Sequence, residues 1–220
     1  MRKSVFSVFL VSLILLSGCS WFQTVEDKPA QELASDGMEA LKAGRYEEAI
    51  SSFEKLKDWY PFSKFAIVAE LKIADAYYRL QDYDEAVFAY ESFENLHPRN
   101  EAIPYVIYQI GRCYFDRIDS VDRDQGSSRK ALETFRRLNS QFPDNPFANK
   151  IGDHINRCLK TLAGHELYVG LYYYKTKHYK AALNRFKTVI SQYPDFGVHR
   201  KAIFYVARCE EKLKSQEKEE

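Results

Sequence analysis

The chain has 220 residues, of which 45% are hydrophobic and 29% charged, and 32 basic residues against 31 acidic ones give a net charge of +1. This length allows one or two domains with a substantial core. The near-neutral balance argues against binding nucleic acid or an anionic membrane surface through charge.

The first eighteen residues have the three parts of a secretory signal peptide. A basic start is followed by an apolar run from Val5 to Leu16, which is too short to span a bilayer as a helix. The run ends in Leu-Ser-Gly-Cys at positions 16–19, which resembles the lipobox of bacterial lipoproteins. We therefore expect a signal peptide over 1–18 and a lipidated Cys19 that carries acyl chains such as palmitate.

The residues after the cysteine indicate where the protein is held. Two or more acyl chains anchor a protein stably, since each buried methylene contributes about 0.8 kcal/mol. Ser20 follows the cysteine, and the sorting rule known for lipoproteins retains those with aspartate there at the inner membrane. That resemblance implies the outer membrane and its periplasmic face. Residues 19–29 show no apolar periodicity, which predicts a flexible tether that reaches on the order of 35 Å.

An aromatic residue or histidine followed by proline occurs four times in the rest of the chain. Because proline disfavours helical geometry in the residue before it, each pair predicts the end of a helix. Upstream of each pair, apolar residues at steps of four and three lie on one helix face. The pairs are Tyr60-Pro61, His97-Pro98, Phe142-Pro143 and Tyr193-Pro194, and the ladders begin at Ala49, Ala86, Ala131 and Ala182.

A second helix is predicted before each ladder, with a small residue near its middle. These residues are Gly37, Ala74, Gly111 and Gly170. The order of small residue, loop, alanine, aromatic and proline matches the tetratricopeptide pattern of about 34 residues. Since one hairpin cannot bury its own apolar face, we predict an all-α, right-handed tetratricopeptide-repeat superhelix, an α-solenoid of about nine helices. It covers 30–214 with about four repeats and a capping helix over roughly His199 to Leu213, followed by a charged tail at 215–220.

Two stretches depart from the repeat. The third repeat is about eight residues longer than the pattern, and its polar excess from Asp116 to Ser128 predicts an exposed loop. Between Pro146 and Thr176 there is no proline, and the glycines are scattered. This second stretch predicts either one unusually long helix or two helices with a kink near Gly164.

Three cysteines remain in the repeats, and each follows a proline by fifteen residues and an arginine by one. Cys113, Cys158 and Cys209 therefore occupy equivalent positions about one repeat apart. That separation exceeds the roughly 7 Å between Cα atoms that a disulfide allows. We expect free cysteines buried between helices.

Motifs that would indicate catalysis are incomplete or missing. His165-Glu166 begins like a zinc-protease motif, but Val169 stands where the second histidine belongs. The sequence contains no Gly-x-Ser-x-Gly elbow, phosphate loop or dinucleotide fingerprint. We therefore predict a protein that is not an enzyme, with no catalytic residue, metal site or cofactor.

Tetratricopeptide proteins bind their ligands in a concave groove lined by the first helix of each hairpin. The register predicts apolar and aromatic wall residues, which suit an extended peptide with alternating apolar side chains. The alternative for each of them is contact with the next repeat. The candidates are Met38, Leu41, Leu71, Tyr78, Tyr108, Phe115, Leu171 and Tyr174.

Several longer stretches resemble the BamD family of outer-membrane lipoproteins. They are Tyr60-Pro61-Phe62, Leu71 to Tyr78, His97 to Gly111, Leu162 to Tyr173 and Ala181 to Arg185. The resemblance runs from about Ala30 to Lys212. It implies a non-catalytic scaffold subunit of the β-barrel assembly machine, which binds unfolded outer-membrane proteins and a BamA-like barrel subunit. The accessory lipoproteins that it would meet are left open.

The same resemblance implies roles for particular residues. Capture of the carboxy-terminal signal of unfolded barrel proteins falls on Tyr60 and Phe62, and Leu71, Tyr78 and Tyr108 would extend that groove. Docking on the barrel subunit falls on Asn184 and Arg185. We expect Arg185 to pair with an acidic group of that partner, because its guanidinium can bind a carboxylate through two hydrogen bonds. An intramolecular salt bridge is the alternative.

A different class of envelope protein remains as a rival interpretation. A periplasmic tetratricopeptide adaptor of the Tol-Pal system or of cell-wall synthesis would share the fold. Such a protein would be expected to have an amino-terminal coiled coil or an additional domain, and the sequence predicts neither.

Overall fold

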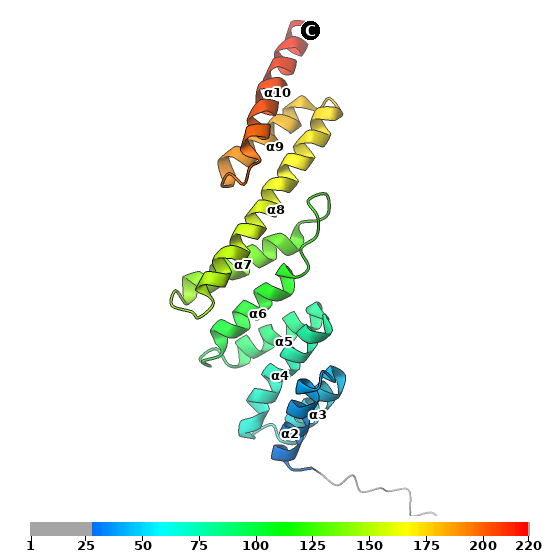
Figure 1. The fold of residues 1–220 in the computed structure, drawn as a ribbon, viewed down its shortest axis with the longest axis vertical. Coiled ribbons are helices and arrows are strands. Elements are labelled where there is room, and N and C mark those ends of the chain that lie inside the picture. The colour runs from blue at the N-terminus through cyan, green and yellow to red at the C-terminus, as the bar shows by residue number, and fades with distance from the viewer. Residues whose placement is uncertain (1–27, 220) are drawn as a thin grey trace, which may run out of the picture.

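The computed structural model describes residues 28–219, and the nine regular elements found there are all α-helices. Figure 1 shows them as a zigzag stack along one axis, with α2 at one end and α10 at the other. The predicted signal peptide and Cys19 lie outside the described residues. The helices are α2 (Ala30–Lys42), α3 (Tyr46–Trp59), α4 (Lys64–Leu80), α5 (Tyr83–Leu96), α6 (Ile103–Phe115), α7 (Gly126–Gln141), α8 (Ala148–Lys175), α9 (Tyr179–Gln192) and α10 (His199–Glu219).

The aromatic-proline and histidine-proline pairs end helices, as predicted. α3, α5 and α7 stop directly before Tyr60, His97 and Phe142, whose backbone angles are no longer helical. The ring of the following proline clashes with a helical conformation at each of these positions. The same clash leaves Tyr193 extended at the end of α9, with φ −123° and ψ 147°.

In three hairpins a glycine of the first helix faces a phenylalanine ring of the second. A Cβ atom added to any of these glycines would lie within 2.6 Å of the ring, far closer than van der Waals contact allows. The pairs are Gly37 with Phe53, Gly111 with Phe135 and Gly170 with Phe186. The two helices can therefore approach closely only because the glycine has no side chain.

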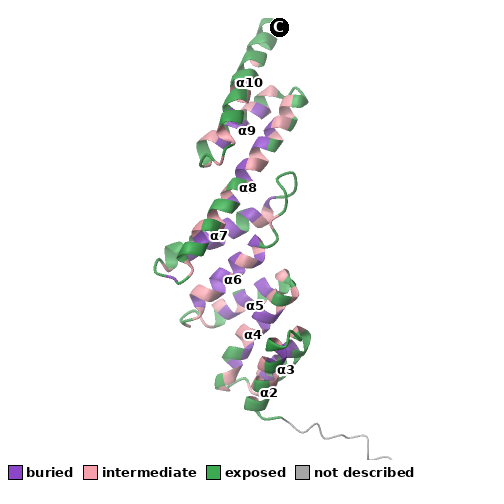
Figure 2. Ribbon diagram, in the orientation of Figure 1, coloured by how far each residue is buried: buried purple, intermediate pink, exposed green. Residues whose placement is uncertain are grey.

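The buried side chains form three clusters along the stack. The first joins α2, α3 and one side of α4, and the second, here called the middle cluster, runs from α4 to Leu162 of α8. The third, here called the C-terminal cluster, joins the second half of α8 to α9 and α10. In Figure 2 the buried residues lie where neighbouring helices meet, and the exposed ones lie on the outside.

The three cysteines are free and completely buried, which confirms their prediction as small apolar residues between helices. Burial raises the pKa of the Cys113 thiol to about 12 and that of Cys158 to about 11. Both thiols therefore stay protonated at neutral pH, where a thiolate would be needed for reactivity.

The stretch between Pro146 and Thr176, for which the sequence allowed one helix or two, forms one continuous helix, α8, of 28 residues. The first half belongs to the middle cluster and the second half to the C-terminal cluster. Gly164 lies between the two halves, and a Cβ there would meet the Val121 side chain at 2.9 Å. The helix passes this glycine without a break, because the long loop before α7 packs against it at that point.

That long loop is mostly exposed, as predicted, but it is shorter than predicted. α7 already begins at Gly126, so the loop spans 116–125. Gln125 is 1% exposed, and its side-chain amide donates to the carbonyls of Ser120 and Arg123. The carbonyl of Val121 is bonded to the ring Nδ1 of His165 on α8, at 2.7 Å. The Gln125 bonds hold the loop together, and the His165 bond ties it to the middle of α8.

The last helix is longer than predicted, since α10 continues through the charged segment to Glu219. That segment contains glutamate, lysine and glutamine, which are good helix formers, and neither proline nor glycine interrupts it. Within residues 28–219, no helix combines the length and the apolar character needed to cross a membrane.

Candidate functional site

A groove of about 500 Å³ crosses the first helices of the first three hairpins. We call it the α2/α4/α6 groove, after the helices that supply most of its lining residues. The wall carries aromatic side chains and three basic ones, with Asp75 between them. The lining residues are Leu41, Lys42, Tyr46, Lys72, Asp75, Tyr78, Arg79, Tyr105 and Gln109.

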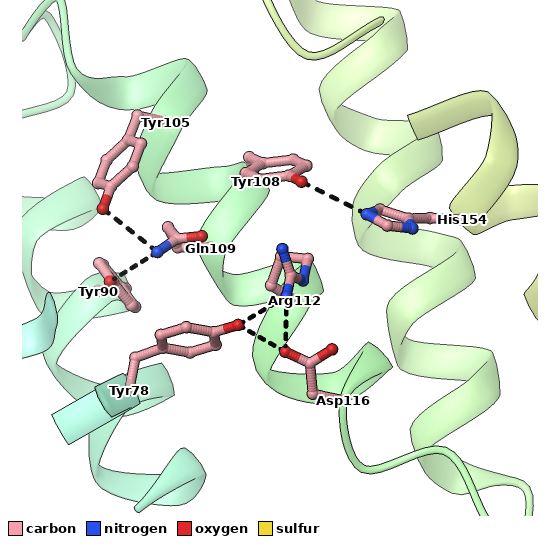
Figure 3. Close-up of polar contacts among 8 residues, drawn as sticks. All are labelled: Tyr78, Tyr90, Tyr105, Tyr108, Gln109, Arg112, Asp116 and His154. Atoms are coloured by element: carbon pink, nitrogen blue, oxygen red, sulfur yellow. Dashed lines mark hydrogen bonds and ion pairs between the residues drawn. The ribbon is translucent and has the colours of Figure 1, made fainter. Parts of the chain in front are cut away.

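Asp75 organises the polar floor of this groove, although only 9% of it is exposed. The hydroxyls of Tyr90 and Tyr105 both donate to its Oδ1 at 2.7 Å, and Lys72 Nζ lies 2.6 Å from its Oδ2. Figure 3 shows Gln109 bonded to both tyrosine hydroxyls. Because a buried charge must be paired and hydrogen-bonded, this network fixes α4, α5 and α6 relative to one another.

A second polar cluster adjoins the groove at Tyr78. Arg112 Nη2 donates to the Tyr78 hydroxyl at 2.8 Å and to Asp116 Oδ2 at 3.0 Å, and the Tyr78 hydroxyl also donates to that carboxylate oxygen (Figure 3). Burial and the bond to Asp116 raise the pKa of Tyr78. The hydroxyl therefore remains a donor at neutral pH and holds α4 against the end of α6.

Tyr108 lies in the core, which differs from the expectation that it lines a groove. Only 5% of it is exposed, and its ring stacks on Phe147 at 4.3 Å between centroids. Its hydroxyl lies 3.4 Å from His154 Nε2 of α8 (Figure 3). Phe115 is buried beside the same histidine. Phe147 and His154 cover this part of α6, so neither Tyr108 nor Phe115 lines the α2/α4/α6 groove.

The other expected substrate residues are spread along α4 rather than gathered. Phe62 is fully exposed just before the helix, while Tyr60 is half-buried and donates its hydroxyl to the Lys28 carbonyl at 3.1 Å. Leu71 is partly buried against the middle cluster, and Tyr78 lies near the far end of the helix. A rise of 1.5 Å per residue places the two ends of α4 roughly 24 Å apart.

The residues expected to dock on a barrel subunit are on α9. Asn184 is exposed and lines a hollow of about 510 Å³ with Lys177, Lys180 and Gln216 among its neighbours. Arg185 lies next to it but is already paired, since its Nη1 donates to both carboxylate oxygens of Glu166 at 2.9 and 3.2 Å. The structure thus contains the intramolecular salt bridge that the sequence left as the alternative.

Sequence reasoning missed Asp75, Gln109, Arg112, Asp116 and His154. One signal was available for Asp75, a charged residue inside the apolar run Ile73-Ala74-Asp75-Ala76. Such a residue must find partners when the helix is buried. The tyrosine partners of Asp75 lie 15 and 30 residues further along the chain, on α5 and α6, so the local sequence does not identify them.

Stacked hairpins with grooves across their first helices define a tetratricopeptide-repeat protein. The solved TPR2AB domain of yeast Sti1 in its pHSP90 complex has the same fold, with a TM-score of 0.53 at 16% identity over 84% of this chain and 71% of that one. This likeness confirms the tetratricopeptide solenoid predicted from the repeats. The described residues include no group of three or more His, Cys, Asp and Glu side chains placed to hold a metal ion.

Comparison with known families identifies the particular kind of repeat protein. The YfiO family, described as outer membrane lipoprotein, matches residues 26–220. The outer membrane protein assembly factor BamD of Vibrio cholerae is 30% identical over 205 residues, which cover 88% of this chain and 85% of that protein. The chain therefore belongs to the BamD (YfiO) family of outer-membrane lipoproteins, as its sequence motifs indicated.

The relatives differ in how much of their length this chain spans. BamD of Pasteurella multocida is 28% identical over 224 residues, which cover 97% of this chain and 86% of the relative. BamD of Caulobacter vibrioides is 30% identical over 179 residues, which cover 81% of this chain but 59% of the relative. This chain thus spans less than two thirds of the Caulobacter protein.

Proposed function

We propose that this chain is a non-catalytic scaffold subunit of the machine that assembles β-barrel proteins in the outer membrane. Membership of the BamD family carries this proposal, because the curated relatives are named outer membrane protein assembly factors. The structure is compatible with a scaffold, since its stack presents two separate polar-lined hollows. Lipid attached to Cys19 would hold the chain on the periplasmic face of the outer membrane.

The first proposed surface captures unfolded outer-membrane proteins. It begins at the exposed ring of Phe62 and the neighbouring Tyr60 and follows α4 to the α2/α4/α6 groove. An extended peptide of about seven residues at 3.3 Å each would span the length of α4. The basic residues Lys42, Lys72 and Arg79 at the groove suit a terminal carboxylate, because charge-assisted hydrogen bonds are the stronger ones.

The second proposed surface docks on the barrel subunit through Asn184 and its lysine-bearing hollow. Its basic character suits an acidic patch on a BamA-like partner. Arg185 would take part only if it exchanges Glu166 for a carboxylate of the partner. Its exposed fraction of 43% leaves it accessible for such an exchange, while Glu166 is only 15% exposed.

Affinity purification from detergent-solubilised membranes tests the assignment. The tagged full chain is expected to recover a large β-barrel protein with periplasmic repeat domains, identified by mass spectrometry. Recovery of Tol-Pal or cell-wall components without that barrel would contradict the assembly role. A Cys19→Ala variant in the same experiment is expected to leave the membrane fraction.

A pair of variants separates the two roles of Arg185. Arg185→Ala and Glu166→Gln both remove the internal salt bridge, so an internal role predicts equal effects on barrel-subunit recovery. Docking through Arg185 predicts that only Arg185→Ala lowers that recovery. Equal recovery from both variants and the native chain would remove Arg185 from the docking surface.

A further inference from the structure

A second groove, of about 610 Å³, lies between α3 and α5 with α4 beneath it; we call it the α3/α5 groove. Ile73 and Tyr77 of α4 line this groove, whereas Asp75 and Tyr78 of the same helix line the α2/α4/α6 groove. The two grooves therefore lie on different sides of α4. A ligand in one leaves the other open.

One wall of the α3/α5 groove presents large apolar side chains to solvent. Phe88 is 75% exposed and Leu96 is 68% exposed, and both line the groove from α5. They are eight residues apart, which places them on one side of the helix about 12 Å from each other. A partner helix offers apolar side chains at the same two-turn spacing, so its contact residues can match this pair.

The rest of the lining is acidic on both sides of the groove. Glu54 of α3 faces Glu85 and Asp84 of α5, and Lys57 is the one basic residue among the lining residues. Asp84 is paired with Arg117, and Glu70 is bonded to His97. Glu54 and Glu85 make no ion pair within residues 28–219, so their charges are available to a ligand.

The charges of Glu54 and Glu85 affect the ionisation of Tyr77 at the floor of the groove. The pKa of the Tyr77 hydroxyl is raised, first by burial and then by Glu54 and Glu85. Positive charge on a ligand would be attracted to these two carboxylates, since complementary charges favour one partner over another. An acidic segment would meet the apolar wall but would be repelled by the carboxylates beside it.

We propose that the α3/α5 groove is a docking site for a cationic amphipathic helix of another protein. Its apolar face would contact Phe88 and Leu96, and its lysine or arginine side chains would pair with Glu54 and Glu85. This site goes beyond the proposed function, because it shares no lining residue with the α2/α4/α6 groove or with the Asn184 hollow.

A synthetic peptide of about 16 residues, with leucines at i, i+4 and i+7 and lysines on the opposite face, provides the probe. Its dissociation constant for the full chain in a non-ionic detergent is measured by fluorescence anisotropy. A peptide with glutamate in place of every lysine is measured beside it. The lysine peptide should bind, and added salt should weaken it because partly exposed charges are screened.

Two sets of variants locate the binding. Phe88→Ser, and separately Glu54→Gln combined with Glu85→Gln, should each weaken the lysine peptide at least about tenfold, as loss of an interface anchor does. Phe204→Ser on α10 and Glu133→Gln on α7 are matched controls, since both residues are exposed and neither lines the α3/α5 groove. These controls should leave the dissociation constant unchanged.

Three results of the peptide measurements would overturn the proposal. They are failure of the lysine peptide to bind, equal binding of the glutamate peptide, and equal weakening by the control variants. Self-association of the chain that Phe88→Ser abolishes, seen by analytical ultracentrifugation, would also overturn it, because the occupant would then be a second copy. All four variants change exposed side chains, so each should fold as the native chain does.

Discussion

Phe135 and Phe186 occupy equivalent positions in the third and fourth repeats, and each ring faces a glycine across its hairpin. Phe135 belongs to the middle cluster, which continues from α4 to α8 on both sides of its hairpin. Phe186 belongs to the C-terminal cluster, which contains residues of α8, α9 and α10 only. The same local contact therefore lies in a continuous core in one region and in a small terminal core in the other.

The connection between these regions is a single helix. α8 contributes Ile151 and Cys158 to the middle cluster and Leu167 to the C-terminal cluster. Since repeats in a solenoid are stabilised mainly by their immediate neighbours, the terminal hairpin should open more easily than the middle of the stack. The proposed substrate and docking surfaces would then lie on regions of different stability.

The largest expected effect comes from truncating the two phenylalanines. Phe135→Ala should destabilise the chain by about 3–5 kcal/mol and lower protection throughout the middle of the stack. Phe186→Ala should produce a loss of similar size that is confined to α9, α10 and the second half of α8. Hydrogen exchange with mass spectrometry distinguishes the two patterns. Phe204→Ala, an exposed substitution of the same kind on α10, should change little.

If Phe186→Ala exposed the α6 and α7 amides as strongly as Phe135→Ala does, the two regions would be one cooperative unit. The distinction between a continuous core and a terminal one would then be wrong.

Removing the buried carboxylate of the middle region should have the next largest effect. Asp75→Ala leaves the hydroxyls of Tyr90 and Tyr105 without their acceptor and Lys72 without its partner. Hydrogen bonds to charged groups contribute about 1.5–3 kcal/mol each, so we expect a loss of about 3 kcal/mol in urea unfolding. Asp75→Asn retains the shape and one acceptor and should lose less. Equal losses from both variants would show that the charge contributes nothing.

The free energy of unfolding should depend on pH through His154, which lies in the half of α8 that belongs to the middle region. Burial, and then the charge of Arg112, lower the pKa of His154 in the folded state. The unfolded chain takes up this proton near pH 6.5. Stability is therefore fully present above about pH 6.5 and falls as the pH drops toward the folded pKa, with a slope of at most about 1.4 kcal/mol per pH unit.

Denaturant midpoints measured at several pH values test this slope. His154→Gln should flatten it, while His178→Gln, in an exposed loop, should leave it steep. An unchanged slope in the His154 variant would mean that other groups cause the dependence.

The smallest expected effect lies at the junction of the two regions. His165→Ala removes the bond to the Val121 carbonyl that ties the 116–125 loop to α8. The loss of about 1 kcal/mol should be local, with faster exchange of the loop amides and little change in α10. Unaltered exchange of the loop would show that contact between Val121 and Gly164 is sufficient to hold it.

Local sequence signals account for most of the fold. The glycines that face phenylalanine rings and the prolines that end helices act within their own hairpin, so each repeat could be predicted from its own residues. The length of α8 could not, because the contact that supports Gly164 comes from a loop more than forty residues earlier. The same limit explains Tyr108, because Phe147 and His154, which cover its ring, lie more than thirty residues later in the chain.

The two proposed binding surfaces lie in different regions of the stack, and one binding experiment tests their independence. Phe62→Ala and Asn184→Ala variants of the tagged full chain are purified from solubilised membranes after crosslinking, and barrel subunit and unfolded outer-membrane protein are both quantified. We predict that Phe62→Ala loses the unfolded protein and keeps the barrel subunit, while Asn184→Ala does the reverse. Loss of both ligands from either variant, or of neither from both, would contradict the account.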